Sequence, residues 1–120
     1  MTDKCETIVV HCMDYRLQGF LNDWLESSLL SRSYDRVAIA GGVYDVYAVI
    51  RQVDIAVRLH GIKKVVFINH EDCGAYGLEG NDERHEEDLR KAREKINKLF
   101  PHLDVELFYL CLDGTFEHID

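Results

Sequence analysis

Hydrophobic residues along the chain alternate between short continuous runs and longer stretches in which they recur every three or four positions. The runs are rich in β-branched residues and predict strands at residues 7–12, 34–40, 65–70 and 105–112. The longer stretches predict helices at residues 17–29, 46–60 and 89–99. Gly61 and Pro101 stand where the second and third helices are expected to end. Six acidic residues within 79–88 are interpreted as a solvated loop and the start of the third helix.

Strands that alternate with helices predict a three-layer α/β/α fold with a mainly parallel sheet. We expect the strand order 2-1-3-4, and Asp113-Gly114 predicts a short hairpin strand at 115–119 beside the fourth strand. In this order, the connections that leave strands one and three diverge to opposite faces of the sheet. Open α/β sheets bind ligands beyond the carboxyl ends of their strands at such a point. A chain of 120 residues fits a single domain, residues 1–120.

The charge balance argues against several classes of partner. The chain carries 14 basic and 22 acidic residues, a formal net charge of −8, which disfavours nucleic acid and anionic membrane surfaces as partners. No apolar run approaches the roughly 18 residues of a membrane span. The first six residues lack the basic and apolar parts of a secretory signal. We therefore expect a cytoplasmic protein that binds neither nucleic acid nor membranes.

Three metal-ligand residues fall at the predicted carboxyl ends of strands one and three. Cys12 ends the first strand, His70 ends the third, and Cys73 follows His70 across a short turn. Adjacent strands lie about 4.8 Å apart, so these side chains can reach one ion. Two thiolates and one imidazole favour Zn²⁺ with an open fourth position. The alternative is that Cys12 is a small buried hydrophobic residue and His70 a hydrogen-bonded polar group at a strand end. The other cysteines, Cys5 and Cys111, are expected only to pack.

Asp14 and Arg16 stand beside the first of these ligands. Asp14 is placed to cap the first helix, and Arg16 in the first turn opposes the helix dipole and so calls for an acidic partner. The pair is either a surface ion pair of about 0–1 kcal/mol or a catalytic pair beside a metal. In the second case Arg16 keeps Asp14 ionised, and Asp14 accepts a hydrogen from a zinc-bound water or hydroxide that attacks a small electrophilic carbon.

Other cysteine and nucleotide chemistries lack their motifs. No cysteine stands at the spacing from an arginine that tyrosine-phosphatase-like loops use, and the chain contains no Cys-x-x-Cys. Gly41-Gly42 lacks the remainder of a Gly-x-Gly-x-x-Gly fingerprint and is interpreted as a turn.

Three ordered motifs resemble those of the β-class carbonic anhydrases. Residues 12–16 are similar to the family's Cys-x-Asp-x-Arg motif, residues 70–74 to its His-x-x-Cys-Gly motif, and residues 40–42 to its Ala-Gly-Asn loop. The resemblance implies that Cys12, His70 and Cys73 bind Zn²⁺ and that Asp14 and Arg16 form the catalytic dyad.

The resemblance also implies hydration of CO₂ to bicarbonate by a homodimer or larger assembly with its pocket near a subunit interface. Gly41, Gly42 and Tyr15 are the expected pocket residues. Tyr15 and Gly42 stand where the family usually has Ser and Asn. Two alternatives remain: a related hydrolase of COS or CS₂, and a non-catalytic zinc-stabilised regulatory or structural domain.

Overall fold

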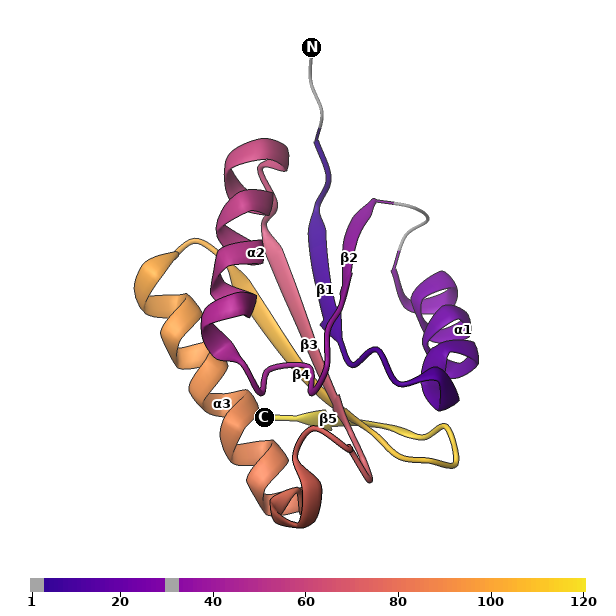
Figure 1. Ribbon diagram of the computed structural model, residues 1–120. Helices are drawn as coiled ribbons and strands as arrows, with labels where there is room; N and C mark the ends of the chain where they lie inside the picture. Colours follow the sequence, from indigo (N-terminus) through magenta and orange to yellow (C-terminus); the bar gives the residue numbers. More distant parts are fainter. Residues whose placement is uncertain (1–3, 30–32) are drawn as a thin grey trace.

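The computed structural model describes residues 4–29 and 33–120, and it contains one five-stranded sheet with helices on both faces (Figure 1). We expected no secretory signal in the first six residues, and residues 1–3 of that segment lie outside the described residues. The strands are β1 (Thr7–His11), β2 (Tyr34–Ala38), β3 (Lys64–His70), β4 (Asp104–Leu110) and β5 (Phe116–Ile119). The α-helices are α1 (Gln18–Ser28), α2 (Val46–His60) and α3 (Asp82–Leu99), with short 3-10 turns η1 (Tyr15–Leu17) and η2 (Gly77–Glu79).

The sheet has the order β2-β1-β3-β4-β5, which confirms the predicted order and the predicted hairpin. β1 through β4 are parallel, and only β5 runs antiparallel to its neighbour β4. β1 therefore lies beside β3 although α1, β2 and α2 separate them in the sequence. The carboxyl ends of β1 and β3 meet at one edge of the sheet, which is the predicted switch point.

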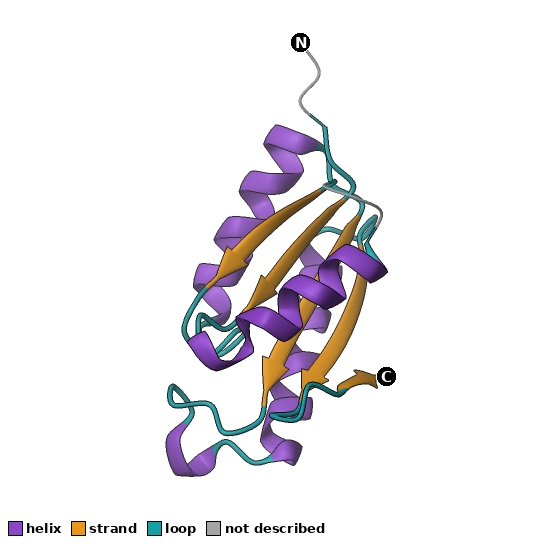
Figure 2. Cartoon of the chain, turned by 90° about the vertical axis from the view of Figure 1, so that its right-hand side faces the viewer, coloured by secondary structure: helices purple, strands orange, loops and turns teal. Residues whose placement is uncertain are grey.

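Two hydrophobic cores lie on the two faces of the sheet, as three layers require. α1 packs on one face through Leu21 and Leu25, whereas α2 and α3 cover the other face; Figure 2 looks onto the sheet with α1 in front of the strands. Neighbouring strand residues alternate between the cores: Val66 faces α1, while Phe67 faces α2 and α3. Burial on both faces explains why β1 and β3 read as continuous apolar runs.

The helix ends follow from capping chemistry. The Asp45 side chain accepts a hydrogen bond from Ala48 N at the start of α2, and Gly61 ends that helix in the left-handed conformation at φ 62°. Asn81 caps α3 in the same way as Asp45, by accepting from Arg84 N. Within the described ranges, no helix combines the length and hydropathy that a bilayer crossing requires.

Candidate metal centre

Cys12, His70 and Cys73 come together at the carboxyl-end edge of the sheet. Cys12 directly follows β1 and His70 is the last residue of β3, and the parallel pairing of these strands aligns their ends. The ligand atoms of the three residues all lie within 4.8 Å of one another, and the two Sγ atoms are 4.0 Å apart. All three side chains are buried. We call this set the carboxyl-end cluster.

The imidazole of His70 is oriented by one hydrogen bond. Its Nδ1 lies 2.7 Å from the Glu71 carbonyl oxygen, which can only accept, so Nδ1 carries the proton and Nε2 carries the lone pair. Nε2 is buried and has no hydrogen-bond partner among the described residues. A buried acceptor without a partner costs about 1–3 kcal/mol, and a coordinated cation would remove that cost. The donor set therefore fits a zinc ion.

The two thiols of the cluster influence each other's ionisation. A hydrogen bond from Cys73 lowers the pKa of Cys12, and the Gly41 amide, which donates to Cys12 Sγ at 3.3 Å, adds to this effect. The same Cys12 contact raises the pKa of Cys73, because two adjacent thiolates repel each other. A divalent cation between them would hold both as thiolates.

Asp14 and Arg16 form a close ion pair at the rim of the cluster. Arg16 Nη2 lies 2.7 Å from Asp14 Oδ2, and Asp14 Oδ1 also accepts from the Arg16 backbone amide at 2.9 Å. The Arg16 hydrogen bonds lower the pKa of Asp14 to about 2. Asp14 thus caps η1, the 3-10 turn that leads into α1, and not α1 itself, which has no side-chain cap; at the same time it pairs with Arg16.

Asp72 holds the other side of the Arg16 guanidinium, a contact that the sequence did not suggest. Arg16 Nη2 donates to the Asp72 carbonyl oxygen at 2.8 Å, and Nη1 donates to Asp72 Oδ2 at 3.1 Å. Asp72 has a φ of 55° in the turn between His70 and Cys73, and that turn brings its carbonyl toward Arg16. The turn that carries two ligands therefore also orients the ion pair.

The Gly41-Gly42 turn is buried against the cluster, where Gly41 N donates to Cys12 Sγ. Both glycines are buried with positive φ, 84° and 61°, so the turn depends on residues that tolerate this conformation. A Cβ on Gly42 would overlap the Asn69 side-chain amide and would lie 2.9 Å from the Ile68 carbonyl oxygen. Glycine at position 42 therefore lets the turn pack closely against β3, and this position allows the Gly41 amide to donate its hydrogen bond to Cys12 Sγ.

A buried polar network on β3 supports this turn, and sequence reasoning missed it. Asn69 Oδ1 accepts from Val43 N at 3.1 Å, and its Nδ2 lies 3.0 Å from Tyr76 Oη and 2.9 Å from His85 Nδ1. Tyr76 Oη in turn donates to Asp88 on α3 at 2.8 Å. The sequence signal for this network was Asn69 itself, because a polar side chain in a strand that is buried on both faces needs buried hydrogen-bond partners.

His85 is the most deeply buried member of that network. Its side chain is fully enclosed, and burial lowers its pKa to about 4. Its Nε2 faces Gly80, where a Cβ would come within 3.3 Å. His85 is therefore a neutral ring that packs between Tyr76 and Tyr109.

An open pocket of about 590 Å³ leads to the carboxyl-end cluster. Its lining includes Cys12, Asp14, Tyr15, Arg16, Asp72 and Ala75. Of the three expected pocket residues, Tyr15 lines the pocket with 86% of its surface exposed, whereas Gly41 and Gly42 are buried and do not line it. The pocket thus places an ion-paired carboxylate beside the buried thiols and leaves room for a small substrate.

Comparisons with known proteins bear on the family and the fold. The family model described as "Putative carbonic anhydrase" matches residues 1–120. An uncharacterized protein of Rickettsia bellii is 30% identical over 98% of this chain and 83% of its own length. The crystal structure of a carbonic anhydrase from Streptococcus mutans matches with a TM-score of 0.70 at 19% identity, over 100% of this chain and 86% of that one.

A carbon disulfide hydrolase in its apo form also shares the fold. It matches with a TM-score of 0.60 at 12% identity, over 94% of this chain and 77% of its own. At these identities the solved structures establish the fold alone, whereas the family model covers the whole chain. The family match confirms the family resemblance: the chain belongs to the carbonic anhydrase family.

Proposed function

We propose that this chain, acting as one zinc domain over residues 1–120, is a zinc-dependent lyase that reversibly hydrates CO₂ to bicarbonate. The observation that carries the proposal is the buried Nε2 of His70, which has no described hydrogen-bond partner and lies with two thiols in the carboxyl-end cluster. Family membership supports the same assignment. Cys12, His70 and Cys73 are the proposed zinc ligands.

Zinc at this position would supply the Lewis acidity that lowers the pKa of a water molecule from its bulk value toward about 7. Two thiolates cancel the charge of Zn²⁺, so this effect depends on help from neighbouring groups. The buried position of the ligands and a nearby hydrogen-bond acceptor are the two forms of help that the chain offers.

Asp14 is the proposed acceptor. Its pKa of about 2 keeps it ionised throughout the neutral range, so it accepts a hydrogen bond from the attacking water and directs the oxygen lone pair at the substrate carbon. Arg16 keeps Asp14 in place through its 2.7 Å ion pair, and Asp72 fixes Arg16 from the other side. The reaction CO₂ + H₂O ⇌ HCO₃⁻ + H⁺ needs no covalent bond to the protein, and buffer takes up the proton.

Exposed apolar side chains near the pocket support a second copy of the chain as partner. Met13 and Tyr15 line the pocket and are 63% and 86% exposed. Covering such residues in a homodimer or larger homo-oligomer would remove apolar surface from water. Light scattering coupled to gel filtration tests this part of the proposal, and a monomer at every concentration contradicts it. A cytoplasmic location is proposed on the composition alone.

Stopped-flow measurement of CO₂ hydration by the zinc-loaded protein tests the proposed activity. We expect a rate well above that of the same concentration of free zinc, and an increase with pH through about 7, where the water ionises. A rate equal to that of free zinc across about pH 7 to 9 contradicts the lyase. Bound zinc without turnover would indicate the zinc-stabilised, non-catalytic domain.

The second candidate is a hydrolase of COS or CS₂. The observation that favours it is the shared fold of the carbon disulfide hydrolase, because the same arrangement of ligands and acceptor can attack any small electrophilic carbon. Sulfide release from COS or CS₂, faster than CO₂ hydration by the same preparation, would establish this activity in place of the first.

A further inference from the structure

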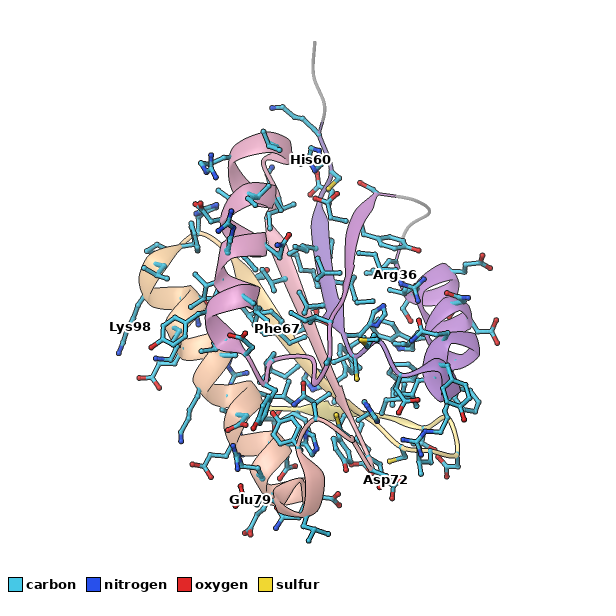
Figure 3. All side chains as sticks on the ribbon, in the orientation of Figure 1. Arg36, His60, Phe67, Asp72, Glu79 and Lys98 are labelled. Atoms are coloured by element: carbon cyan, nitrogen blue, oxygen red, sulfur yellow. The ribbon has the colours of Figure 1, made fainter. Side chains whose placement is uncertain are left out.

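A second group of metal-ligand side chains lies at the opposite, amino-terminal edge of the sheet. Cys5, Asp35 and His60 place a thiol, a carboxylate oxygen and an imidazole nitrogen within 4.8 Å of one another, and all three are half-buried. Figure 3 shows His60 at one end of the sheet and Asp72, beside the carboxyl-end cluster, at the other. We call this set the amino-end cluster.

The backbone holds the three residues of the amino-end cluster in place. Cys5 N donates to the His60 carbonyl oxygen at 3.2 Å, which ties the segment before β1 to the end of α2. Asp35 lies opposite Ile8 in the β1–β2 ladder. His60 is the last residue of α2, and the left-handed Gly61 that follows ends the helix there. Two of the ligands therefore come from regular elements, Asp35 from β2 and His60 from α2, and the third comes from the segment before β1 that the Cys5 N hydrogen bond ties to α2.

The side chains are already close to the arrangement that a metal site requires. His60 Nδ1 and Asp35 Oδ2 are 2.7 Å apart. Tetrahedral zinc holds S, N and O ligands at about 2.0–2.3 Å, which separates the ligand atoms by about 3.3–3.8 Å. Small rotations of the three side chains would bring their ligand atoms from the present separations, all within 4.8 Å, to those of a tetrahedral zinc site. A surface pocket of about 240 Å³ borders Asp35 and His60 and gives an ion access.

We propose that Cys5, Asp35 and His60 form a second zinc-binding site, separate from the carboxyl-end cluster. The donor set of one thiolate, one imidazole and one carboxylate suits Zn²⁺ better than Mg²⁺ or Ca²⁺, which take oxygen ligands. A bound ion cross-links the segment before β1, strand β2 and the end of α2. Its role is to stabilise this edge of the sheet, and it takes no part in the reaction at the other edge.

The same three residue types also build nucleophilic triads, and the contacts decide against that interpretation. The Cys5 thiol donates to the Thr7 carbonyl oxygen at 3.6 Å. Burial and the nearby Asp35 carboxylate raise the pKa of Cys5, so without a cation the sulfur stays a neutral thiol and a weak nucleophile. A divalent cation neutralises the carboxylate and stabilises the thiolate, which is why the cluster fits a metal better than a substrate.

Zinc stoichiometry of the full chain tests the proposal. Protein stripped of metal, dialysed against excess ZnSO₄ and freed of unbound ion by gel filtration, is expected to retain two zinc ions per chain by elemental analysis. Cys5→Ser and His60→Gln are each expected to retain one zinc ion and to keep the wild-type CO₂ hydration rate. Cys111→Ser is the matched control, because Cys111 is also partly buried and hydrogen-bonds Glu117 but belongs to neither cluster, and it is expected to retain two.

Cobalt(II) gives a readout that depends on neither activity nor the proposed function. The double variant Cys12→Ser/Cys73→Ser lacks the carboxyl-end thiols, so any thiolate-to-cobalt charge-transfer absorption in it must come from another cysteine. We expect this absorption to persist in the double variant and to disappear when Cys5→Ser or His60→Gln is added. Circular dichroism establishes that each variant is folded, and His60→Gln replaces Cys5→Ser should the latter misfold.

Three results would overturn the second site. They are a single zinc ion per wild-type chain under saturating zinc, two zinc ions retained by both Cys5→Ser and His60→Gln, and a cobalt absorption in the double variant that Cys5→Ser leaves unchanged. Failure of CO₂ hydration would count against the proposed function and leave these metal readouts unaffected.

Discussion

The two edges of the sheet carry similar residues in different physical situations. In the carboxyl-end cluster the ligands are buried and His70 Nε2 has no described hydrogen-bond partner. In the amino-end cluster the ligands are half-buried and His60 Nδ1 already lies 2.7 Å from a carboxylate. A buried, unpartnered imidazole nitrogen beside two thiols favours a cation, whereas His60 Nδ1 already has a hydrogen-bond partner in Asp35. The comparison therefore predicts tight binding at the first edge and weaker binding at the second.

The surroundings differ as much as the ligands do. The carboxyl-end cluster has the Asp14–Arg16 pair at its rim and a pocket of about 590 Å³ in front of it. The pocket beside Asp35 and His60 is about 240 Å³. A metal site becomes a reaction site only when an oriented acceptor and space for substrate accompany it.

Removing a ligand of the carboxyl-end cluster should have the largest effect. We expect Cys12→Ser and Cys73→Ser to lose zinc from this site and to reduce CO₂ hydration to the rate of free zinc. The loss should exceed the roughly 10- to 100-fold that removal of an outer partner costs. Elemental analysis and stopped-flow kinetics measure the two quantities.

Cys111→Ser is the control for these ligand variants and should keep both the zinc and the rate. Full zinc occupancy of the carboxyl-end site in either ligand variant would refute the assignment of that cysteine.

Disrupting the ion pair should reduce activity without removing zinc. Asp14→Asn removes the negative acceptor, and Arg16→Gln removes the guanidinium hydrogen bonds, which are the largest cause of the low pKa of Asp14. We expect each to lower kcat/KM by about 10- to 100-fold, because both act beside the metal rather than on it. Zinc content, measured on the same samples, should match that of the wild type.

Arg58→Gln provides a matched control, because Arg58 pairs with Asp54 on the exposed surface of α2, far from the pocket. It should keep the full rate. Wild-type kcat/KM in Asp14→Asn would remove Asp14 from the mechanism.

Competition with a chelator should separate the two edges. Because the amino-end ligands are half-buried and already paired, we expect their zinc to leave first, with dissociation constants that differ by at least about 10-fold, or about 1.4 kcal/mol. Loss of the first equivalent should leave CO₂ hydration unchanged. If activity instead disappears with the first equivalent, the ranking of the two sites is wrong.

The buried network behind the carboxyl-end cluster should appear in the pH dependence of stability. The folded pKa of His85 is about 4, below the usual value of about 6.5, so the unfolded chain binds a proton at His85 between these pH values and the folded chain does not. The free energy of unfolding should therefore fall as the pH decreases from about 6.5 to 4, by up to about 3 kcal/mol from this group.

Urea unfolding of metal-free protein at about pH 7 and pH 4.5 measures this effect. His85→Gln should lose part of the decrease, whereas His102→Gln on an exposed turn should follow the wild type. Equal decreases in the wild type and His85→Gln would mean that His85 is not the group responsible.

The sequence predicted the fold because hydrophobic periodicity and helix-end residues are local signals. Val46–His60 was expected as a helix with Gly61 as its stop, and the helix has those bounds. The alternation of strands and helices led us to expect the strand order 2-1-3-4, and the structure has β1 beside β3 as that order requires. Once the strand order followed, Cys12, His70 and Cys73 had to meet at one edge.

Contacts that depend on side-chain direction between distant segments were decided only by the tertiary structure. No periodic pattern in the sequence marks these contacts. They are the hydrogen bond from Arg16 to the Asp72 carbonyl oxygen and the hydrogen bonds of the Asn69 amide with Val43 N and His85 Nδ1. Cys5 was expected only to pack, yet folding places it beside Asp35 and His60, residues far away in the sequence. Periodic patterns determine which face of a strand or helix is buried, whereas the partner of a polar group depends on where the whole fold places it.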